Sequence, residues 1–233
     1  MNELTYLDQK SFKTFSIFSF FSILTLIIFL SMFSLKYTVK NITYENNYDL
    51  NYNSFELVQD KSIWLIDESD FVQFYEDNLN VESLVISKQL PNQVFIDIVV
   101  YEKIILISDL RDTRPKEVVL FRNLYTELSE SNIQLPRLTI TNGPIPEGFY
   151  SEIISLILTV NKYNLTINNL TLLYDGSELT GSYKNTILNI GRPIDLSKKA
   201  TVVGYILEEN NCDGEVTIID ANNNDEIETI LNC

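Results

Sequence analysis

The chain of 233 residues carries 17 Lys and Arg against 32 Asp and Glu, which gives a formal net charge of −15. A surface this acidic repels nucleic acid and anionic headgroups, which argues against a nucleic-acid-binding or polybasic lipid-binding role. Histidine is absent, so the commonest general base, the commonest metal ligand and every Ser-His-Asp or Cys-His arrangement are excluded.

The first predicted element is an apolar run from Thr14 to Leu35 that contains no charge, glycine or proline. A helix of this length rises about 33 Å, enough to cross a hydrocarbon core of about 30 Å. We therefore expect a cytoplasmic tail over 1–13, a transmembrane helix over 14–35 and an extracytoplasmic region after it. The alternative, a cleaved signal peptide, is disfavoured because the run exceeds the usual apolar core and no small-x-small site follows.

Hydroxyl side chains recur at every third position within this run, at Ser16, Ser19, Ser22 and Thr25. One interpretation is a polar strip that packs against a neighbouring transmembrane helix. The other, which we favour, is that each hydroxyl bonds the backbone of its own helix, because a spacing of three drifts around a helix of about 3.6 residues per turn.

Five elements are expected over 37–103, in the order strand, helix, helix, strand, strand. The last two strands flank the turn Pro91-Asn92-Gln93 and alternate as half-buried strands do. Asp67–Asp70 supplies an N-cap for the second helix, and Trp64 is expected to fill the core between helix and sheet. The expected bounds are Val39–Tyr44, Ser54–Gln59, Phe71–Leu79, Val81–Leu90 and Val94–Glu102.

From Ile104 onward strands predominate, with a helix among them. Pro146 opens this helix, whose apolar stripe runs to Val160. The expected strands are Ile104–Ser108, Glu117–Phe121, Ile167–Tyr174, Glu178–Ser182 and Asn185–Ile190.

Motifs along the whole chain resemble, in the same order, those of the FtsQ/DivIB family of bacterial cell-division proteins. In the POTRA domain of that family an apolar-x-apolar-x-basic strand leads through a proline turn into a second strand, and Leu84–Lys88, Pro91-Asn92 and Val94–Ile98 follow this pattern. Further stretches resemble the β domain of the family. Gln134–Leu138 and Ile187–Pro193 match two of its strand segments, and Asp195–Lys199 with Val202–Leu207 resembles its lysine-bearing helix. Ile218–Asp220 resembles its final strand, which the resemblance places here at Glu215–Asp220.

Two positions depart from the family pattern. The family glutamate comes sooner after the proline than Glu102 does, and Lys103 stands where the family has arginine. We therefore expect Glu102 to have a structural role, such as closing a salt bridge at the domain junction.

The resemblance implies an α+β protein with a single N-terminal transmembrane helix, a POTRA-like βααββ domain over 37–103 and a mixed, mostly antiparallel β domain with flanking helices over 104–220. It implies a noncatalytic, single-pass scaffold at the division septum, which links FtsB/DivIC-like and FtsL-like partners to septal cell-wall synthesis. No cofactor, metal or small-molecule substrate is expected. The alternative is a membrane-tethered extracytoplasmic ligand-binding or sensory module, which a deep apolar pocket in the second domain would favour.

The partner-binding residues are expected on the last strand, because unpaired N–H and C=O groups at a sheet edge can accept a strand from a partner. In the family, the C-terminal part of the β domain binds FtsB/DivIC and FtsL. The residues here that match it are Thr217, Ile218, Ile219 and Asp220.

Residues 221–233 allow two interpretations. Either the segment extends the preceding strand, and Ile227 and Ile230 dock the partner while acidic side chains steer it by charge, or it is a frayed acidic tail. Cys212 and Cys233 have no metal-ligand spacing; they either pair with each other in an oxidising compartment or are free thiols.

Overall fold

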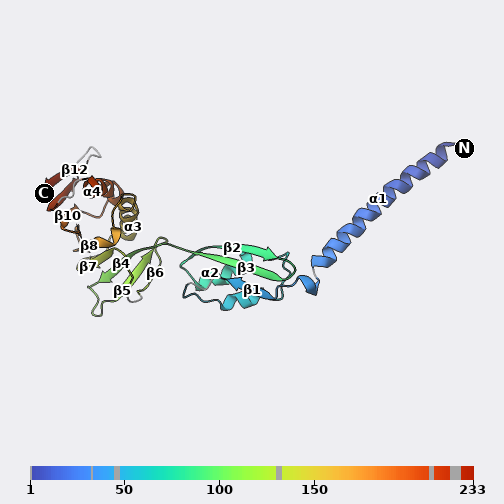
Figure 1. The fold of residues 1–233 in the computed structure, drawn as a ribbon, viewed down its shortest axis with the longest axis horizontal. Helices are drawn as coiled ribbons and strands as arrows, with labels where there is room; N and C mark the ends of the chain where they lie inside the picture. The colour runs from blue at the N-terminus through green and yellow to red at the C-terminus, as the bar shows by residue number, and fades with distance from the viewer. Residues whose placement is uncertain (1, 33, 45–47, 130–132, 210–212, 221–226) are drawn as a thin grey trace. The chain divides into compact units, whose positions relative to one another are not determined.

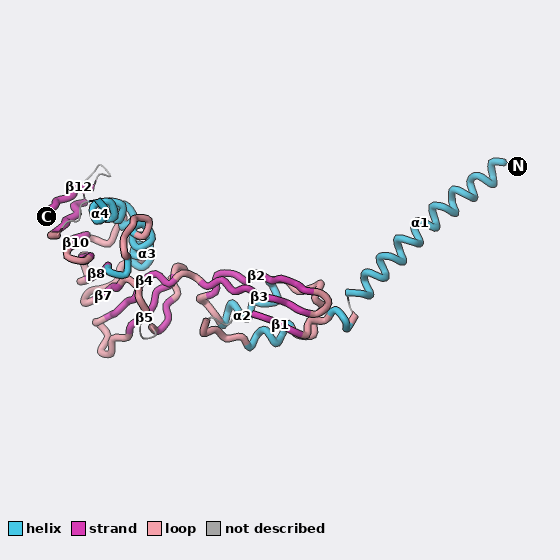
Figure 2. Tube along the Cα trace, in the orientation of Figure 1, coloured by secondary structure: helices cyan, strands magenta, loops and turns pink. Residues whose placement is uncertain are grey.

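A computed structural model describes the chain except for residues 1, 33, 45–47, 130–132, 210–212 and 221–226; the side chains of residues 2–13, 31, 32, 35 and 220 are also outside the description. The protein is α+β and divides into two compact units, Met1–Val100 and Tyr101–Cys233 (Figures 1 and 2). The boundary lies close to the junction expected between residues 103 and 104.

The N-terminal helix differs from the expectation. α1 runs continuously over Asn2–Met32, and the end of the predicted span lies in a separate 3-10 turn, η1 (Leu35–Tyr37). Within the part of the chain that the structure describes, no helix combines the length and the apolar character needed to cross a membrane. The predicted transmembrane helix over 14–35 is therefore wrong.

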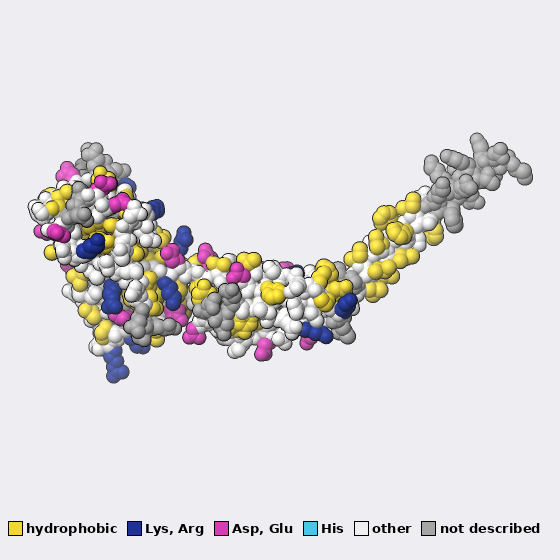
Figure 3. Space-filling view, in the orientation of Figure 1, with side chains coloured by type: hydrophobic (Ala, Val, Ile, Leu, Met, Phe, Trp, Pro, Cys, Tyr) yellow, Lys and Arg dark blue, Asp and Glu magenta, His cyan; other side chains and the backbone are white. Residues whose placement is uncertain are grey.

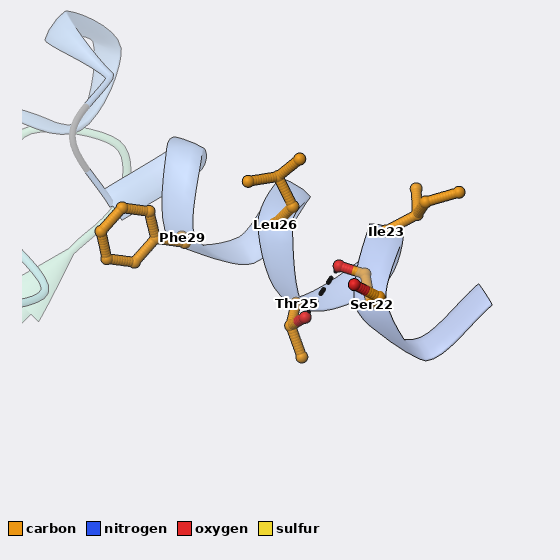
Figure 4. Close-up of a pocket in the computed structure, with 5 residues that line it drawn as sticks. All are labelled: Ser22, Ile23, Thr25, Leu26 and Phe29. Carbon is orange, nitrogen blue, oxygen red and sulfur yellow. Dashed lines mark hydrogen bonds between the residues drawn. The ribbon is translucent and has the colours of Figure 1, made fainter. Parts of the chain in front are cut away.

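A shallow depression on α1 is lined by five residues of this one helix, Ser22, Ile23, Thr25, Leu26 and Phe29 (Figure 4). Within it the Thr25 hydroxyl donates a hydrogen bond to the Ser22 carbonyl at 2.8 Å. A hydroxyl on an apolar helix commonly bonds the preceding turn in this way. For Thr25, the interpretation in which the hydroxyl bonds its own helix is confirmed.

The remainder of the first unit is a three-stranded sheet with short helices. The strand order is β1-β3-β2, with β1 parallel and β2 antiparallel to β3. Asp67 begins the second helical segment with a capping box, in which its carboxylate accepts from the Ser69 N–H and Asp70 accepts from the Asp67 N–H. The elements are β1 (Asn41–Tyr44), η2 (Asn53–Val58), η3 (Glu68–Phe71), α2 (Val72–Asp77), β2 (Val81–Gln89) and β3 (Gln93–Val100).

Aromatic rings fill the core of this sheet and its helices. Phe55, Phe71 and Phe74 are all buried, and the Phe55 ring lies 4.6 Å from that of Phe74 and 5.4 Å from that of Phe71, centroid to centroid. Such tilted and edge-on pairs stabilise a core beyond the burial of their area.

Trp64 does not take the place expected for it in this core. Its side chain is 43% exposed and its ring lies 5.7 Å from that of Tyr37. Ile63 and Ile66, on either side of it in the chain, are buried instead. The smaller neighbours supply the packing here, so the predicted core role of Trp64 is wrong.

The second unit is built on a nine-stranded mixed sheet with the order β12-β11-β10-β9-β8-β7-β4-β5-β6. Helices α3 and α4 connect parallel neighbours, from β7 to β8 and from β10 to β11, as parallel pairing requires. The elements are β4 (Lys103–Asp109), β5 (Glu117–Phe121), β6 (Thr126–Leu128), β7 (Arg137–Ile140), α3 (Phe149–Val160), η4 (Ile167–Asn169), β8 (Leu170–Tyr174), β9 (Leu179–Tyr183), β10 (Thr186–Gly191), α4 (Leu196–Glu209), β11 (Glu215–Asp220) and β12 (Ile227–Asn232).

The two helices cover one face of this sheet (Figure 1). They share one buried core with the strands, and β8 shows the alternation that results: Leu170, Leu172 and Tyr174 are buried while Thr171 and Leu173 are exposed. Because successive strand residues point to opposite faces, the second face of the sheet at β8 is open.

Glu102 acts through its backbone. Its carbonyl oxygen accepts a hydrogen bond from the Arg122 N–H at 2.9 Å. Among the described residues, Glu102 belongs to none of the ion pairs, so the predicted salt bridge is wrong. The ion pairs join Lys61 to Asp70, Arg111 to Asp109 and Arg137 to Glu117.

Candidate partner-binding edge

The predicted binding strand, β11, lies inside the sheet and not at its edge. It pairs in parallel with β10 on one side and antiparallel with β12 on the other. Every residue from Thr217 to Asp220 therefore has a neighbouring strand on the side where an open edge was expected. The edge lies one strand further out, at β12, and the tail interpretation is wrong for residues 227–232.

β12 is the last strand in the sheet order, so its outer side has no partner strand in the described chain. The Ile187 N–H donates to the Gly214 carbonyl at 2.8 Å. Because the backbone groups of successive strand residues point to alternate sides, this bond shows which residues of β11 pair with β10 and which pair with β12. In the antiparallel register that follows, Glu228, Ile230 and Asn232 bond inward to β11. The N–H and C=O groups of the intervening residues, 227, 229 and 231, point outward and can pair with an added strand.

The predicted site residues fall on two faces of this edge. Ile230 lies opposite Thr217, and both are on the open face with Ile219; Ile230 is 49% and Ile219 39% exposed. Ile218 is buried and Ile227 packs against the core, so these two stabilise the strands. The structure thus brings together Thr217, Ile219 and Ile230 but separates them from Ile218 and Ile227.

Asp220 belongs to β11 through its backbone, opposite Ile227. Its side chain lies outside the described residues. Its predicted role in partner binding stays a prediction.

Asn189, which the sequence analysis does not single out, links β10 to β11 on the open face. Its side-chain amide donates to the Glu215 carboxylate at 2.5 Å and to the Thr217 hydroxyl at 3.2 Å. The Thr217 side chain is therefore engaged within the sheet. The sequence signal for Asn189 is the alternation within β10. Ile187 and Asn189 lie on one face of the strand, and Leu188 between them is buried on the other.

The end of β12 approaches the start of β11 closely. A Cβ on Gly214 would collide with the Asn232 carbonyl, so only glycine permits this approach. Cys233, directly after β12, is disulfide-bonded, so the free-thiol interpretation is wrong for this residue. Cys212 lies outside the described residues.

A groove of about 270 Å³ crosses β4, β5 and β7, with Leu106, Ser108 and Thr139 in its lining. Arg137 and Glu117 also line it and form an exposed ion pair at 3.5 Å. The lining is mixed and the groove is small, in contrast to the deep apolar pocket that a ligand-binding module would need. The described residues also contain no group of three or more Cys, Asp or Glu side chains that could hold a metal ion.

The chain matches no protein-family model and no curated protein. The motifs of the chain and the geometry of the β12 edge are therefore the observations that bear on its function.

Proposed function

We propose that this protein is a noncatalytic scaffold of the bacterial divisome, of the FtsQ/DivIB type. It binds FtsB/DivIC-like and FtsL-like partners and links them to septal cell-wall synthesis. The observation that carries the proposal is the outer edge of β12, where outward backbone groups and the exposed Ile230 lie together at the end of a long sheet. Main-chain pairing along such an edge gives affinity, and alternate side chains give specificity.

Two further observations support the proposal. The first unit has the order strand, helix, helix, strand, strand, and the hairpin β2–β3 contains the motif Leu84–Lys88 that resembles the POTRA domain of the family. The disulfide at Cys233 favours an oxidising compartment, because disulfides persist there and are rare in a reducing cytosol. Both fit a second unit that works outside the cytoplasm at the septum.

The test combines localisation with partner binding in cells of the source organism. A fluorescent fusion of the full chain should concentrate at the septum of dividing cells. Ile230→Asp should reduce co-purification of the FtsB/DivIC-like and FtsL-like proteins by about tenfold, because a buried unpaired carboxylate at an interface centre costs more than about 1 kcal/mol.

Leu128→Asp is the matched control. Leu128 is an exposed apolar residue on β6, the strand at the other edge of the same sheet, so this change should leave co-purification intact. A fusion spread evenly around dividing cells, together with partner recovery that Ile230→Asp does not alter, would contradict the proposal.

A further inference from the structure

The C-terminal part of the second unit has charge of one sign only. From Ala200 to Cys233 the sequence contains eight acidic residues and no Lys or Arg. Figure 3 shows Asp and Glu side chains around this end of the unit, with Lys and Arg side chains of other segments beside them. The acidic residues are Glu208, Glu209, Asp213, Glu215, Asp220, Asp225, Glu226 and Glu228.

One of these residues, Glu228, lies on the edge strand itself. It is exposed, and it lies opposite Ile219 on the open face, two residues before Ile230. Among the described ion pairs, none includes Glu228. A strand added to β12 would lie directly beside this carboxylate, because opposed side chains of neighbouring strands are about 5 Å apart.

The cations nearest in the sheet are at the two ends of β10. Lys184 precedes β10 and its ammonium lies 5.2 Å from the centre of the Tyr183 ring. Arg192 directly follows β10 and is exposed. Both are at least two strands away from the outer side of β12, since β11 and β12 lie between.

From these observations we propose that the strand received by β12 is basic, with a Lys or Arg facing Glu228. The inference rests on the proposed function, whose strand-accepting edge it uses. In an antiparallel addition the partner residue opposite Ile230 comes first and the one opposite Glu228 comes two residues later, on the same face. The partner segment therefore reads apolar-x-basic in its N-to-C direction, and the acidic surround accelerates its association.

The experiment uses the full chain in its own cells, with the photo-reactive residue p-benzoylphenylalanine in place of Ile230. The crosslinked segment is identified by mass spectrometry, so its sequence is read directly. The expected segment has a Lys or Arg two residues after the crosslinked position. Glu228→Lys should reduce the crosslink yield by about tenfold at low ionic strength, and added salt should shrink this difference.

Glu178→Lys is the control, because Glu178 is an exposed glutamate in the turn before β9, three strands from β12. It makes the same charge change and should leave the yield unaltered. A synthetic peptide of the captured segment provides a second readout: its Lys→Glu form should bind Glu228→Lys better than it binds the unaltered chain.

Three results would overturn the inference: a captured segment that is acidic or lacks a cation, a yield that Glu228→Lys does not change, or no crosslink at Ile230. If the fusion still concentrates at the septum in these cases, the proposed function stands, and only the inference that β12 receives a basic strand is wrong. If septal localisation is also lost, both fail.

Discussion

At the scale of single residues, Arg111 forms a fork around Asp109 and ties two loops together. Its Nε and Nη2 donate to the two carboxylate oxygens of Asp109 at 2.8 and 2.6 Å, and its Nη1 donates to the Gly143 carbonyl at 2.7 Å. The hydrogen bonds from Arg111 hold the pKa of Asp109 below its ordinary value of 3.8. Two bonds in parallel make such a pair directional as well as attractive.

This fork predicts a pH dependence of stability. Because the pKa of Asp109 is lower in the folded than in the unfolded chain, its contribution is complete above the ordinary value of 3.8 and is lost as the pH falls through the folded value. Asp109→Asn should therefore destabilise the second unit at pH 7, by no more than about 1 kcal/mol for a pair this exposed. The difference from the unaltered chain should vanish at low pH.

Urea unfolding of both proteins across pH 2 to pH 7, roughly the range in which carboxylates titrate, measures this difference. Asp112→Asn, in the same loop but outside the fork, controls for the loss of a negative charge. A destabilisation by Asp109→Asn that is as large below the folded pKa as at neutral pH would contradict the argument.

At the scale of elements, Gly214 determines whether β12 can pair with β11. A side chain at this position would meet the Asn232 carbonyl, so Gly214→Ala should loosen the β11–β12 pairing. Hydrogen exchange of the Glu228, Ile230 and Asn232 amides, which bond inward to β11, should become at least about tenfold faster, since the loss of about 1.4 kcal/mol of local stability changes an opening equilibrium tenfold.

Gly148→Ala is the control for the cost of replacing a glycine. Gly148 has a φ of 75° and no neighbouring atom where a Cβ would lie, so alanine there should lower the stability of the unit by about 1 kcal/mol through backbone strain. It should leave the relative exchange within β12 unchanged. Equal effects of both variants on β12 would exclude a specific role for Gly214.

The success of prediction differed between elements for physical reasons. β2 and β3 were predicted to within a few residues, because one face is buried and the proline turn separates two alternating runs. The strand extension expected after residue 220 could not be told from a tail or given bounds, because an edge strand at the end of a sheet exposes Ile230 and Leu231 on both faces and lacks the period of two. Misplacing the edge put four of the predicted site residues, Thr217–Asp220, one strand inward, whereas Ile227 and Ile230 lie on the edge strand itself.

At the scale of the whole molecule, the sequence predicted the order of elements but not the order of strands in the sheet. The pairing of β4 with β7, and of β10 with β11, joins strands separated by other elements. Such neighbours depend on how α3 and α4 pack on the same face. No local pattern carries that information, because side chains such as Leu138 and Val203 are simply apolar in the sequence.

Each unit has a hydrophobic core of its own, which predicts two separate unfolding transitions. The single tryptophan, Trp64, belongs to the first unit, so its fluorescence reports that unit, whereas circular dichroism reports both. Phe74→Ala removes a fully buried ring of the first core and should cost about 3–5 kcal/mol. The fluorescence midpoint should fall by more than about 10 °C for a unit of this size.

Leu138→Ala makes the matched change in the second core, where Leu138 is fully buried. It should cost about 2–5 kcal/mol and lower the midpoint of the other transition in circular dichroism while the fluorescence midpoint stays in place. If Leu138→Ala moves both midpoints together, the units unfold cooperatively, and a change at the β12 edge could then be transmitted to the first unit.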